Sequence, residues 1–304
     1  MKFKKLNIED KEIFQKYVGT YEFGTYEYSF LTLYIWRKML NVEIGIIEDS
    51  LIIKKQEQQK GSYFMQPMGY EKKNLKEIVY KLNEITKRDK SFKNLFRDIE
   101  FPFLYELMDL YKGNVCLCED INNFDYIYKS EDLISLSGHK FHRKKNLYNQ
   151  FIGNYNYKIK DICQDNVVRD CINFSHMWYE QRQEEDEQLK YELESISEIL
   201  PNFRTLGFKG MAVYVDNKIA GFTVGEKVNS NMAIIHIEKG DFKYNGIYAF
   251  INKAFTERYL SDVKLINRQE DLGIKGLRKA KKSYNPVKLE KKFIVNVDKI
   301  DIMC

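Results

Sequence analysis

The chain has 304 residues, of which 44% are hydrophobic and 31% are charged, and its formal net charge is +5. This balance excludes extended disorder and a disulfide-stapled mini-protein, and the length corresponds to about two domains. A charge this small indicates nucleic-acid binding only where it is clustered. The apolar stretch 28–36 is about half of the ~20 residues that a membrane-spanning helix needs, and no secretory signal follows the N-terminus. The sequence therefore predicts a cytoplasmic protein without a transmembrane segment.

Strand and helix patterns alternate in the first half. Its expected elements are a helix, three strands and an amphipathic helix, over 27–39, 42–47, 50–55, 63–65 and 74–88. Glu48 and Asp49 are expected to form the turn between the first two strands. We expect no metal site, because Cys116 and Cys118 are typical of buried strand thiols and the histidine pair His139 and His142 lies among cations.

The second half has a clearer α+β pattern. Its expected elements are three antiparallel strands, a helix, a strand, a helix and a strand, over 210–215, 219–224, 232–237, 246–260, 263–266, 274–282 and 287–297. Before them, 166–200 is typical of one or two helices.

Charge is distributed unevenly along this half. Residues 180–198 hold eight acids and two cations, a net charge of −6, whereas 275–292 hold eight cations and Glu290, a net charge of +7. The acidic run is most simply a solvated face, and the alternative is that it faces a cationic partner or substrate.

The order of three antiparallel strands, loop, helix and strand resembles the core of the GNAT acyltransferase fold. Lys239 to Tyr248 lies where a GNAT protein carries its pyrophosphate loop, and Lys243 and Gly246 match that motif loosely. Tyr248 stands where a small residue lets the backbone approach the pyrophosphate of coenzyme A, so we expect no tight coenzyme A site.

Two further stretches, 125–146 and 267–286, together with Ile237-Glu-Lys239, resemble the proteins grouped with the phosphatidylglycerol lysyltransferase C-terminal domain. The likeness covers nearly the whole chain, and Gly276 to Pro286 is its most specific part. It implies an α+β, tandem GNAT-like fold with mixed, mainly antiparallel sheets, in two domains over 1–150 and 151–304. It also implies a relationship to the Fem-type transferases, which take an amino acid from aminoacyl-tRNA.

The resemblance implies an enzyme that moves an aminoacyl group to an amine or hydroxyl of a small-molecule or lipid head-group acceptor. Aminoacyl-tRNA is then a better expected donor than coenzyme A, and no cofactor is required. Two alternatives remain open: an acyl-CoA-dependent N-acyltransferase, and a non-catalytic protein that binds RNA or anionic head groups.

Candidate catalytic residues are a general base, two acids that hold an ammonium or act as base, and a hydroxyl donor: Glu238, Glu270, Asp271 and Tyr284. Candidate residues for binding substrate or phosphate are Lys140, Arg143, Lys144, Asn146, Lys239, Asn267, Arg268, Arg278 and Lys281. Arg278 and Lys281 are three apart on the helix that starts after Gly273, so they share a face that can grip a phosphate. The alternative interpretations are a strand-end acid for Glu238, helix-capping acids for Glu270 and Asp271, and a solvated basic helix.

Overall fold

The computed structural model describes residues 2–19, 21–112, 114–181 and 186–297. It divides the chain into two compact units: the residues up to Phe124 together with those from Glu290 onward, and Asp125–Leu289. This differs from the expected division at residue 150. Strand β7 (Asp125–Lys129) pairs with β12 (Leu265–Asn267), and the C-terminal strand β14 (Phe293–Val297) pairs with β5 (Phe92–Ile99). Residues 125–150 therefore belong to the second unit.

The first unit is built on a seven-stranded sheet with the order β1-β2-β3-β4-β5-β14-β6. Its remaining strands are β1 (Lys4–Lys5), β2 (Glu43–Ile47), β3 (Ser50–Glu57), β4 (Gly61–Phe64) and β6 (Val115–Glu119). Its helices are α1 (Lys11–Val18), α2 (Phe30–Trp36), α3 (Leu75–Arg88) and α4 (Phe101–Tyr111). Side chains of α3 and α4 pack on β5 and β14 in one apolar core.

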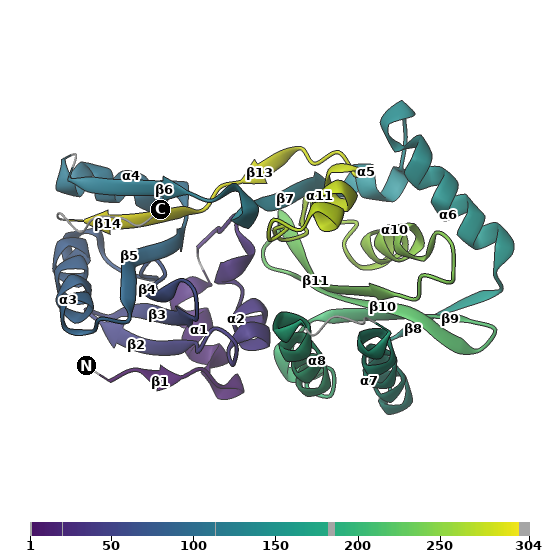
Figure 1. Ribbon diagram of the computed structural model, residues 1–304, viewed down its shortest axis with the longest axis horizontal. Coiled ribbons are helices and arrows are strands. Elements are labelled where there is room, and N and C mark those ends of the chain that lie inside the picture. Colours follow the sequence, from purple (N-terminus) through teal and green to yellow (C-terminus); the bar gives the residue numbers. More distant parts are fainter. Residues whose placement is uncertain (1, 20, 113, 182–185, 298–304) are drawn as a thin grey trace. The chain divides into compact units, whose positions relative to one another are not determined.

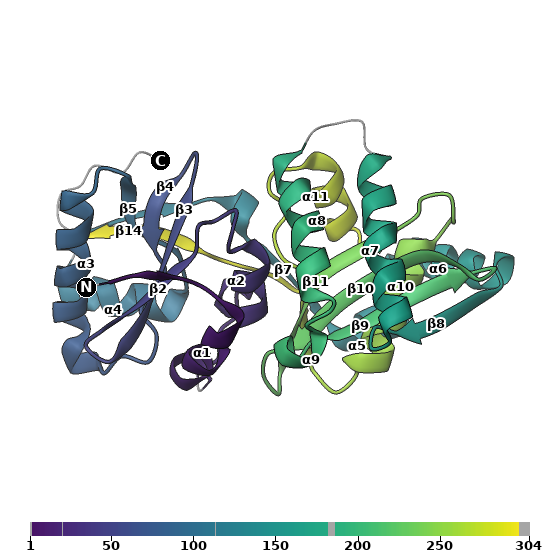
Figure 2. The same ribbon diagram turned by 90° about the horizontal axis from the view of Figure 1, so that it is seen from below.

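The second unit has a seven-stranded sheet with the order β13-β7-β12-β11-β10-β9-β8. Its remaining strands are β8 (Tyr157–Asp161), β9 (Lys209–Val215), β10 (Lys218–Lys227), β11 (Met232–Gly240) and β13 (Lys288–Glu290). Its helices are α5 (Ser130–Ser135), α6 (His142–Asn154), α7 (Asp165–Glu180), α8 (Glu187–Ile199), α9 (Phe203–Leu206), α10 (Ile247–Tyr259) and α11 (Lys275–Lys282). Helices α7 and α8 lie on one face of this sheet and α10 on the other (Figures 1 and 2).

The predicted hairpins and amphipathic helices are confirmed. Glu48 and Asp49 adopt φ angles of 46° and 52°, the left-handed conformation of a two-residue hairpin turn, and Asp216 and Asn217 do the same at 49° and 63°. Phe250 and Phe255 of α10 lie at the centre of the second unit's core, as their helical spacing predicts.

Three expectations differ from the structure. The aromatic helix expected over 27–39 is shorter, because Ser29 caps α2 by accepting a hydrogen bond from the Thr32 N–H at 3.2 Å. The last strand, expected over 287–297, is two strands, β13 and β14, in different sheets. Cys116 lies on a strand as predicted, but on the edge strand β6, where it is exposed instead of buried.

The feature that positions the candidate site is an opening between two parallel strands. β11 and β12 pair from Met232↔Leu265 to Ile234↔Asn267 and no further, although β11 continues to Gly240. The β10–β11 register also shifts between Val224 and Gly225, which is a β-bulge opposite this point. The Gln269 amide Nε2 bridges the opening by donating to the Ile235 carbonyl at 2.9 Å.

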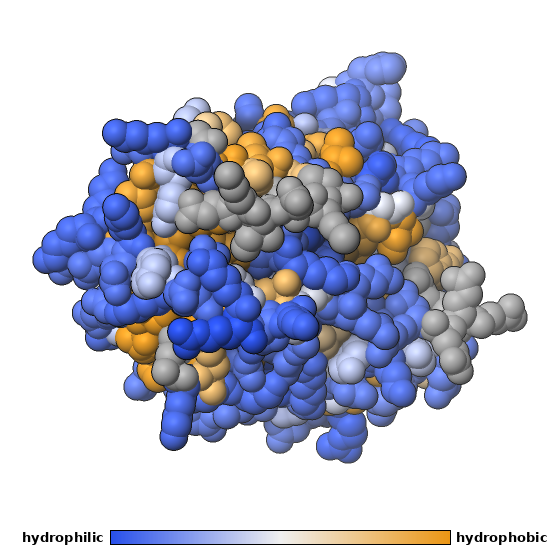
Figure 3. Space-filling view, turned by 60° about the vertical axis from the view of Figure 1, so that its left-hand side comes forward, coloured by the Kyte–Doolittle hydropathy of each residue, from blue (hydrophilic) through white to orange (hydrophobic). Residues whose placement is uncertain are grey.

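The surface is largely hydrophilic and is interrupted by small apolar groups (Figure 3). The exposed large hydrophobic side chains include Phe101, Tyr105 and Met108 of α4, which are 46–58% exposed at helical spacing. Within the described ranges, no helix combines the length and apolarity needed to span a membrane.

Candidate functional site

An ion pair lies at the opening between β11 and β12. Glu238, near the end of β11, accepts a hydrogen bond on Oε1 from Arg268 Nη2 at 3.0 Å, and the two side chains are only 13% and 12% exposed. Arg268 directly follows β12, so each partner comes from one of the two diverging strands. Asn252 on α10 donates from Nδ2 to the second carboxylate oxygen, Glu238 Oε2, at 3.3 Å. Both oxygens of Glu238 are thereby positioned by protein donors.

Aromatic rings and a lysine surround the guanidinium. The Arg268 Cζ atom lies 4.7 Å from the ring centre of Tyr284 and 5.6 Å from that of Tyr128. Lys144 on α6 places its Nζ 3.9 Å from the centre of the same Tyr284 ring. Three elements, β7, β11 and α6, and the segments after β12 and α11 therefore bring an acid, two cations and two phenols together within the second unit.

The ionisation of these groups reflects their burial. Burial, and after it the positive charge of Arg268, lowers the pKa of Lys144 to about 8, while Glu238 opposes the change. Burial alone would lower the pKa of Arg268, but Glu238 and the two tyrosines raise it above its ordinary value. The pKa of Tyr284 is raised by burial, with Arg268 acting against it. At neutral pH the cluster therefore holds a fixed arginine cation and a lysine that readily gives up its proton.

Among the described residues, two buried atoms of this cluster have no hydrogen-bond partner: Arg268 Nη1, a donor, and Asn252 Oδ1, an acceptor. Asn252 is completely buried. Because a buried polar group without a partner is costly, such atoms usually mark a place where water or a ligand binds. Here a donor and an acceptor both belong to residues that contact the Glu238 carboxylate.

Asp271 and Arg278 form a second ion pair, separate in its contacts from Glu238. Asp271 is 1% exposed and accepts hydrogen bonds from Arg278 Nε and Nη2, both at 2.7 Å. It also accepts from the Tyr126 hydroxyl at 2.6 Å and the Gly273 N–H at 2.8 Å. Burial would raise the pKa of Asp271, but Arg278 and the other donors lower it to about 2. These contacts tie α11 to β7, a structural task for the predicted catalytic acid Asp271.

Lys281 and Arg278 share a helix face as predicted, but this face points into the protein. Lys281 is 8% exposed, and its Nζ donates to the carbonyls of Arg268 at 2.6 Å, Gln269 at 3.1 Å and Glu270. Burial lowers its pKa to about 8. The Lys281 contacts fix the segment after β12, which carries Arg268, while Arg278 is 32% exposed and binds Asp271. The phosphate grip expected of the two residues stays a prediction.

Lys239, expected to bind phosphate, is also engaged inside the fold. It is 5% exposed, its Nζ lies 2.6 Å from Glu192 Oε2 on α8, and it lies 3.8 Å from the ring centre of Trp178 on α7. The pair attaches both helices to the end of β11. Glu192, one acid of the 180–198 run, is therefore engaged within the protein. Residues 182–185 of that run lie outside the described residues, and both interpretations of the run stay predictions.

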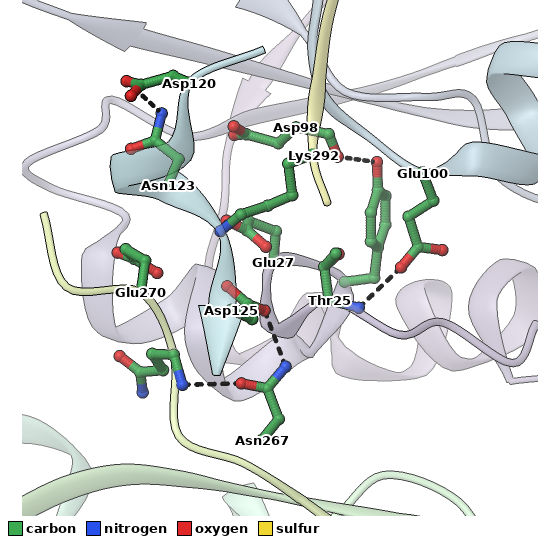
Figure 4. Close-up of polar contacts among 12 residues, drawn as sticks. Thr25, Glu27, Asp98, Glu100, Asp120, Asn123, Asp125, Asn267, Glu270 and Lys292 are labelled. Carbon is green, nitrogen blue, oxygen red and sulfur yellow. Dashed lines mark hydrogen bonds and ion pairs between the residues drawn. The ribbon is translucent and has the colours of Figure 1, made fainter. Parts of the chain in front are cut away.

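Asn267 and Glu270 lie on either side of Arg268 in sequence. Asn267 is buried and donates from Nδ2 to Asp125 Oδ2 at 2.8 Å, while its own oxygen accepts from the Gln269 N–H at 2.7 Å (Figure 4). Glu270 is partly buried, and its backbone carbonyl binds Lys281. Asn267 thus shapes the turn after β12 and does not reach the surface.

The remaining predicted cations lie at the surface. Lys140, Arg143 and Asn146 are exposed at the start of α6, and Lys140 Nζ lies 3.3 Å from Asp132. On α11 the exposed positions are Lys275, Lys279 and Lys282, which follow helical spacing. The Asn285 side chain donates to the Lys140 carbonyl at 3.1 Å, so the end of α11 lies beside the start of α6. We call the exposed cations Lys140, Arg143, Lys275, Lys279 and Lys282 the basic surface.

The loop before α10 is filled by its own side chains. The Tyr248 hydroxyl donates to the Gly240 carbonyl at 3.1 Å, and its ring lies 5.3 Å from that of Phe242. The Asn245 N–H is bound by the Tyr155 hydroxyl at 3.1 Å. Gly246 has φ 85°, and a Cβ there would lie 2.0 Å from the Leu147 carbonyl oxygen, so α6 packs closely on this end of α10.

Sequence analysis did not identify Asn252, Tyr128 or Gln269 as site residues. Asn252 lies on the buried side of an amphipathic helix. A polar residue at such a position usually has a specific hydrogen-bond partner, and this pattern could have identified it from the sequence. Tyr128 and Gln269 carry no such signal, because tyrosine is abundant in this chain and glutamine is common in turns.

Comparison with solved structures establishes the fold. A protein of unknown function from Bacteroides thetaiotaomicron VPI-5482 is 29% identical, with a TM-score of 0.87 over 97% of this chain and 99% of that chain. L-PGS from Bacillus licheniformis is 14% identical, with a TM-score of 0.65 over 98% and 94% of the chains. FemX is 10% identical, with a TM-score of 0.59 over 97% of each chain. The expected α+β, GNAT-like fold is confirmed.

Sequence comparison establishes the family. An uncharacterised protein of Mycoplasmoides gallisepticum (strain R(low / passage 15 / clone 2)), MYCGA3080, is 27% identical over 173 residues, which is 57% of this chain and 56% of that protein's length. The family model described as phosphatidylglycerol lysyltransferase, C-terminal, matches residues 19–296. With the GNAT-like fold, this match supports an acyltransferase-type function. The chain belongs to the phosphatidylglycerol lysyltransferase C-terminal family, as its sequence resemblance implied.

Proposed function

We propose that this protein moves an aminoacyl group from aminoacyl-tRNA to an amine or hydroxyl of a small-molecule or lipid head-group acceptor. The reaction takes place at the opening between β11 and β12. The observation that carries the proposal is the buried Glu238–Arg268 pair, with a donor atom on Arg268 and an acceptor atom on Asn252 that have no protein partner. Aminoacyl transfer requires such groups next to the reacting carbonyl.

The chemistry needs a proton acceptor and a donor for the oxyanion. The acceptor's nitrogen or oxygen attacks the ester carbonyl carbon, and its proton passes to Glu238. The carbonyl oxygen becomes an oxyanion, which Arg268 Nη1 stabilises by a charge-assisted hydrogen bond. The bond from the carbonyl carbon to the ribose oxygen of tRNA then breaks, and this oxygen leaves with the proton that Glu238 received. No oxidant, metal or further cofactor enters this balance.

Asn252 and Lys144 have supporting roles in this proposal. Asn252 Oδ1 accepts a hydrogen bond from the ammonium of the transferred amino acid, beside the negative charge of Glu238. Lys144 lies over the Tyr284 ring, and its pKa is lowered by the positive charge of Arg268. In this proposal its ammonium faces a phosphate of the aminoacyl-tRNA donor. The basic surface on α6 and α11 binds the tRNA backbone, as a cluster of exposed lysines does with phosphates generally.

Two comparisons support the donor and acceptor classes. The family description names phosphatidylglycerol lysyltransferase, a reaction in which an aminoacyl group reaches a lipid head group. The second is the likeness to FemX, whose fold is shared at a TM-score of 0.59. Coenzyme A is a poorer donor in this proposal, because the Tyr248 side chain in the first turn of α10 reaches back to the Gly240 carbonyl, in the region where a pyrophosphate must approach.

The test is transfer from radiolabelled aminoacyl-tRNAs, presented one amino acid at a time, to a mixture of small amines and phosphatidylglycerol vesicles. Glu238→Gln and Arg268→Met are expected to lower transfer at least 100-fold, the usual effect of losing a general base or an oxyanion donor. The matched controls are Glu257→Gln and Arg258→Met, exposed acid and arginine on α10, which should retain the wild-type rate. If Glu238→Gln and Arg268→Met both transfer at the wild-type rate, the assigned chemistry is wrong.

A second candidate function rests on the basic surface alone. Lys275, Lys279 and Lys282 form an exposed stripe that suits a non-catalytic protein binding RNA or anionic head groups. In that case binding falls steeply with added salt, and no aminoacyl transfer accompanies it.

The third alternative is an acyl-CoA-dependent N-acyltransferase, and isothermal calorimetry with coenzyme A tests it. Such an enzyme binds coenzyme A, whereas the packing of Tyr248 predicts that this protein does not.

A further inference from the structure

A buried arginine in the first unit has no acidic partner. Arg97 on β5 is 8% exposed, and within the described ranges no carboxylate lies within ion-pair distance of its guanidinium. The neighbouring acid, Asp98, is held instead by Lys55, whose Nζ lies 3.1 Å from Asp98 Oδ2. Burying a guanidinium without a counter-charge is costly, and buried charges in proteins are normally paired. The two arginines of the second unit's clusters, Arg268 and the partly exposed Arg278, by contrast, each face a carboxylate.

Two buried asparagines, Asn94 in contact with Arg97 and Asn296 opposite Leu95 on the next strand, each carry a donor without a partner among the described residues. Asn94 Oδ1 accepts from Arg97 Nη1 at 3.2 Å, so its other atom is the Nδ2 donor. Asn296 on β14 accepts from the Leu95 N–H on Oδ1 at 2.5 Å, which likewise makes Nδ2 its donor. Both residues are at least 95% buried, and in the described part of the chain Asn94 Nδ2, Asn296 Nδ2 and Arg97 Nε have no hydrogen-bond partner.

No side chain within the described ranges accepts a hydrogen bond from these three donors. Tyr63 presents the face of its ring, whose centre lies 5.6 Å from the Arg97 Cζ atom, and its hydroxyl donates to Glu57. The ring gives a modest cation–π attraction but carries no charge. Residues 94–97 of β5 and Asn296 on the adjacent strand β14 thus carry three buried donors, next to an aromatic ring and an arginine whose charge acts on Asp98 without an ion pair.

We propose that Arg97, Asn94 and Asn296 form an oxyanion-binding site in the first unit, which takes a carboxylate or phosphate group. An oxyanion accepts from Arg97 Nε and from the two amide Nδ2 atoms and neutralises the guanidinium. The planar guanidinium fork suits carboxylate and phosphate oxygens in particular. This site uses no residue of the Glu238 cluster and is independent of the transferase proposal.

The experiment is calorimetric unfolding of the full chain at constant ionic strength, with chloride replaced by inorganic phosphate or by acetate. We expect the melting temperature of the first unit to rise with one of these anions. At 100 times the dissociation constant, binding multiplies the folded-to-unfolded ratio about 100-fold. Phosphate and acetate are separate arms, and the arm that responds identifies the oxyanion class. If neither raises the melting temperature, the proposal is overturned.

Variants locate the effect. Arg97→Met should abolish the response, whereas Arg88→Met, an arginine that is 82% exposed on α3, should retain it. Asn94→Asp replaces the orphan donor with a carboxylate oxygen next to Arg97, so we expect a higher melting temperature without added anion and no response to anion. This variant tests the site even if Arg97→Met fails to fold. A lower melting temperature for Asn94→Asp, or an undiminished response in Arg97→Met, contradicts the proposal.

Discussion

The contacts of Asp271 predict that Asp271→Asn weakens the fold and leaves the chemistry of Glu238 in place. Asp271 is 1% exposed and accepts two hydrogen bonds from Arg278, one from Tyr126 and one from the Gly273 N–H. Asparagine keeps one acceptor but loses the charge, so the bidentate pair with Arg278 is lost. We therefore expect the second unit to lose stability, with α11 detached from β7.

The magnitude follows from the pKa of this carboxyl. Arg278 and the other donors hold it at about 2, against an ordinary value of 3.8. A difference of about 1.8, at 1.36 kcal/mol per pKa unit, corresponds to about 2 kcal/mol of the free energy of unfolding. Breaking a buried pair typically costs about 3–5 kcal/mol, and the exposure of Arg278 reduces that figure here, so about 2–3 kcal/mol is expected.

The sign of the pH dependence is fixed by the direction of the pKa change. A carboxyl whose pKa is lowered by folding stabilises the protein above its unfolded pKa and loses that contribution as the pH falls through its folded pKa. The difference in unfolding free energy between wild type and Asp271→Asn should thus be constant from pH 8 to pH 5. It should shrink as the pH falls from 3.8 towards 2.

Urea unfolding measures this difference in the relevant unit. The chain has two tryptophans, Trp36 in the first unit and Trp178 in the second, so a Trp36→Phe background leaves Trp178 as the reporter of the second unit. The control is Asp262→Asn, which removes a surface pair with Lys227 and should cost under about 1 kcal/mol. A loss below about 0.5 kcal/mol in Asp271→Asn, or one that varies between pH 5 and pH 8, refutes the reasoning.

Three further perturbations test the packing of the second unit by the same assay. Lys281 releases its proton near pH 8 in the folded protein and near 10.5 unfolded, so wild-type stability should rise with pH between these values, and Lys281→Met should remove that rise. Gly246→Ala should destabilise by over about 3 kcal/mol, since its Cβ meets the Leu147 carbonyl, while Gly276→Ala, in open space, should be neutral or stabilising by up to about 1 kcal/mol. Glu192→Gln should cost about 3 kcal/mol by leaving Lys239 buried without its counter-charge, and a change in Trp178 fluorescence should accompany it. A cost below about 1 kcal/mol for either Gly246→Ala or Glu192→Gln, or an unchanged pH slope for Lys281→Met, contradicts these expectations.

The sequence predicted elements well where apolar residues follow one clear period. The three strands that became β9, β10 and β11, and the helix that became α10, have such periods and short turn signals between them. Strand β5 was missed because Asn94 and Arg97 are buried within it, so hydrophobic and polar residues do not alternate. The domain boundary was displaced because β7 and β14 pair with strands far away in the sequence, which local patterns cannot reveal.

For the candidate site, the sequence identified residues but not their partners. Glu238 and Arg268 were both proposed, in different roles, and only the fold brings residues 30 positions apart into one ion pair. Arg278 and Lys281 were expected to face a phosphate because helical spacing places them on one face. Spacing does not tell which way that face turns, and here it turns inward to Asp271 and to the carbonyls after β12.

The two arginine–carboxylate pairs of the second unit differ in how completely they are hydrogen-bonded, and this difference distinguishes a structural pair from a catalytic one. Asp271 engages two nitrogens of Arg278 and takes two further donors, and a polar network satisfied to this degree holds a segment rigidly. Arg268 is bound to Glu238 through Nη2 and leaves Nη1 buried without a partner, which is costly for stability alone. Lys281 donates a hydrogen bond to the backbone carbonyl of Arg268 and so fixes the backbone of this residue. Arg268, whose guanidinium is incompletely paired, is therefore held in a fixed position. A rigid segment that carries an unsatisfied donor to the opening between two strands is what oxyanion stabilisation requires, and on this ground Arg268, instead of Arg278, is the arginine that we assign to the reaction.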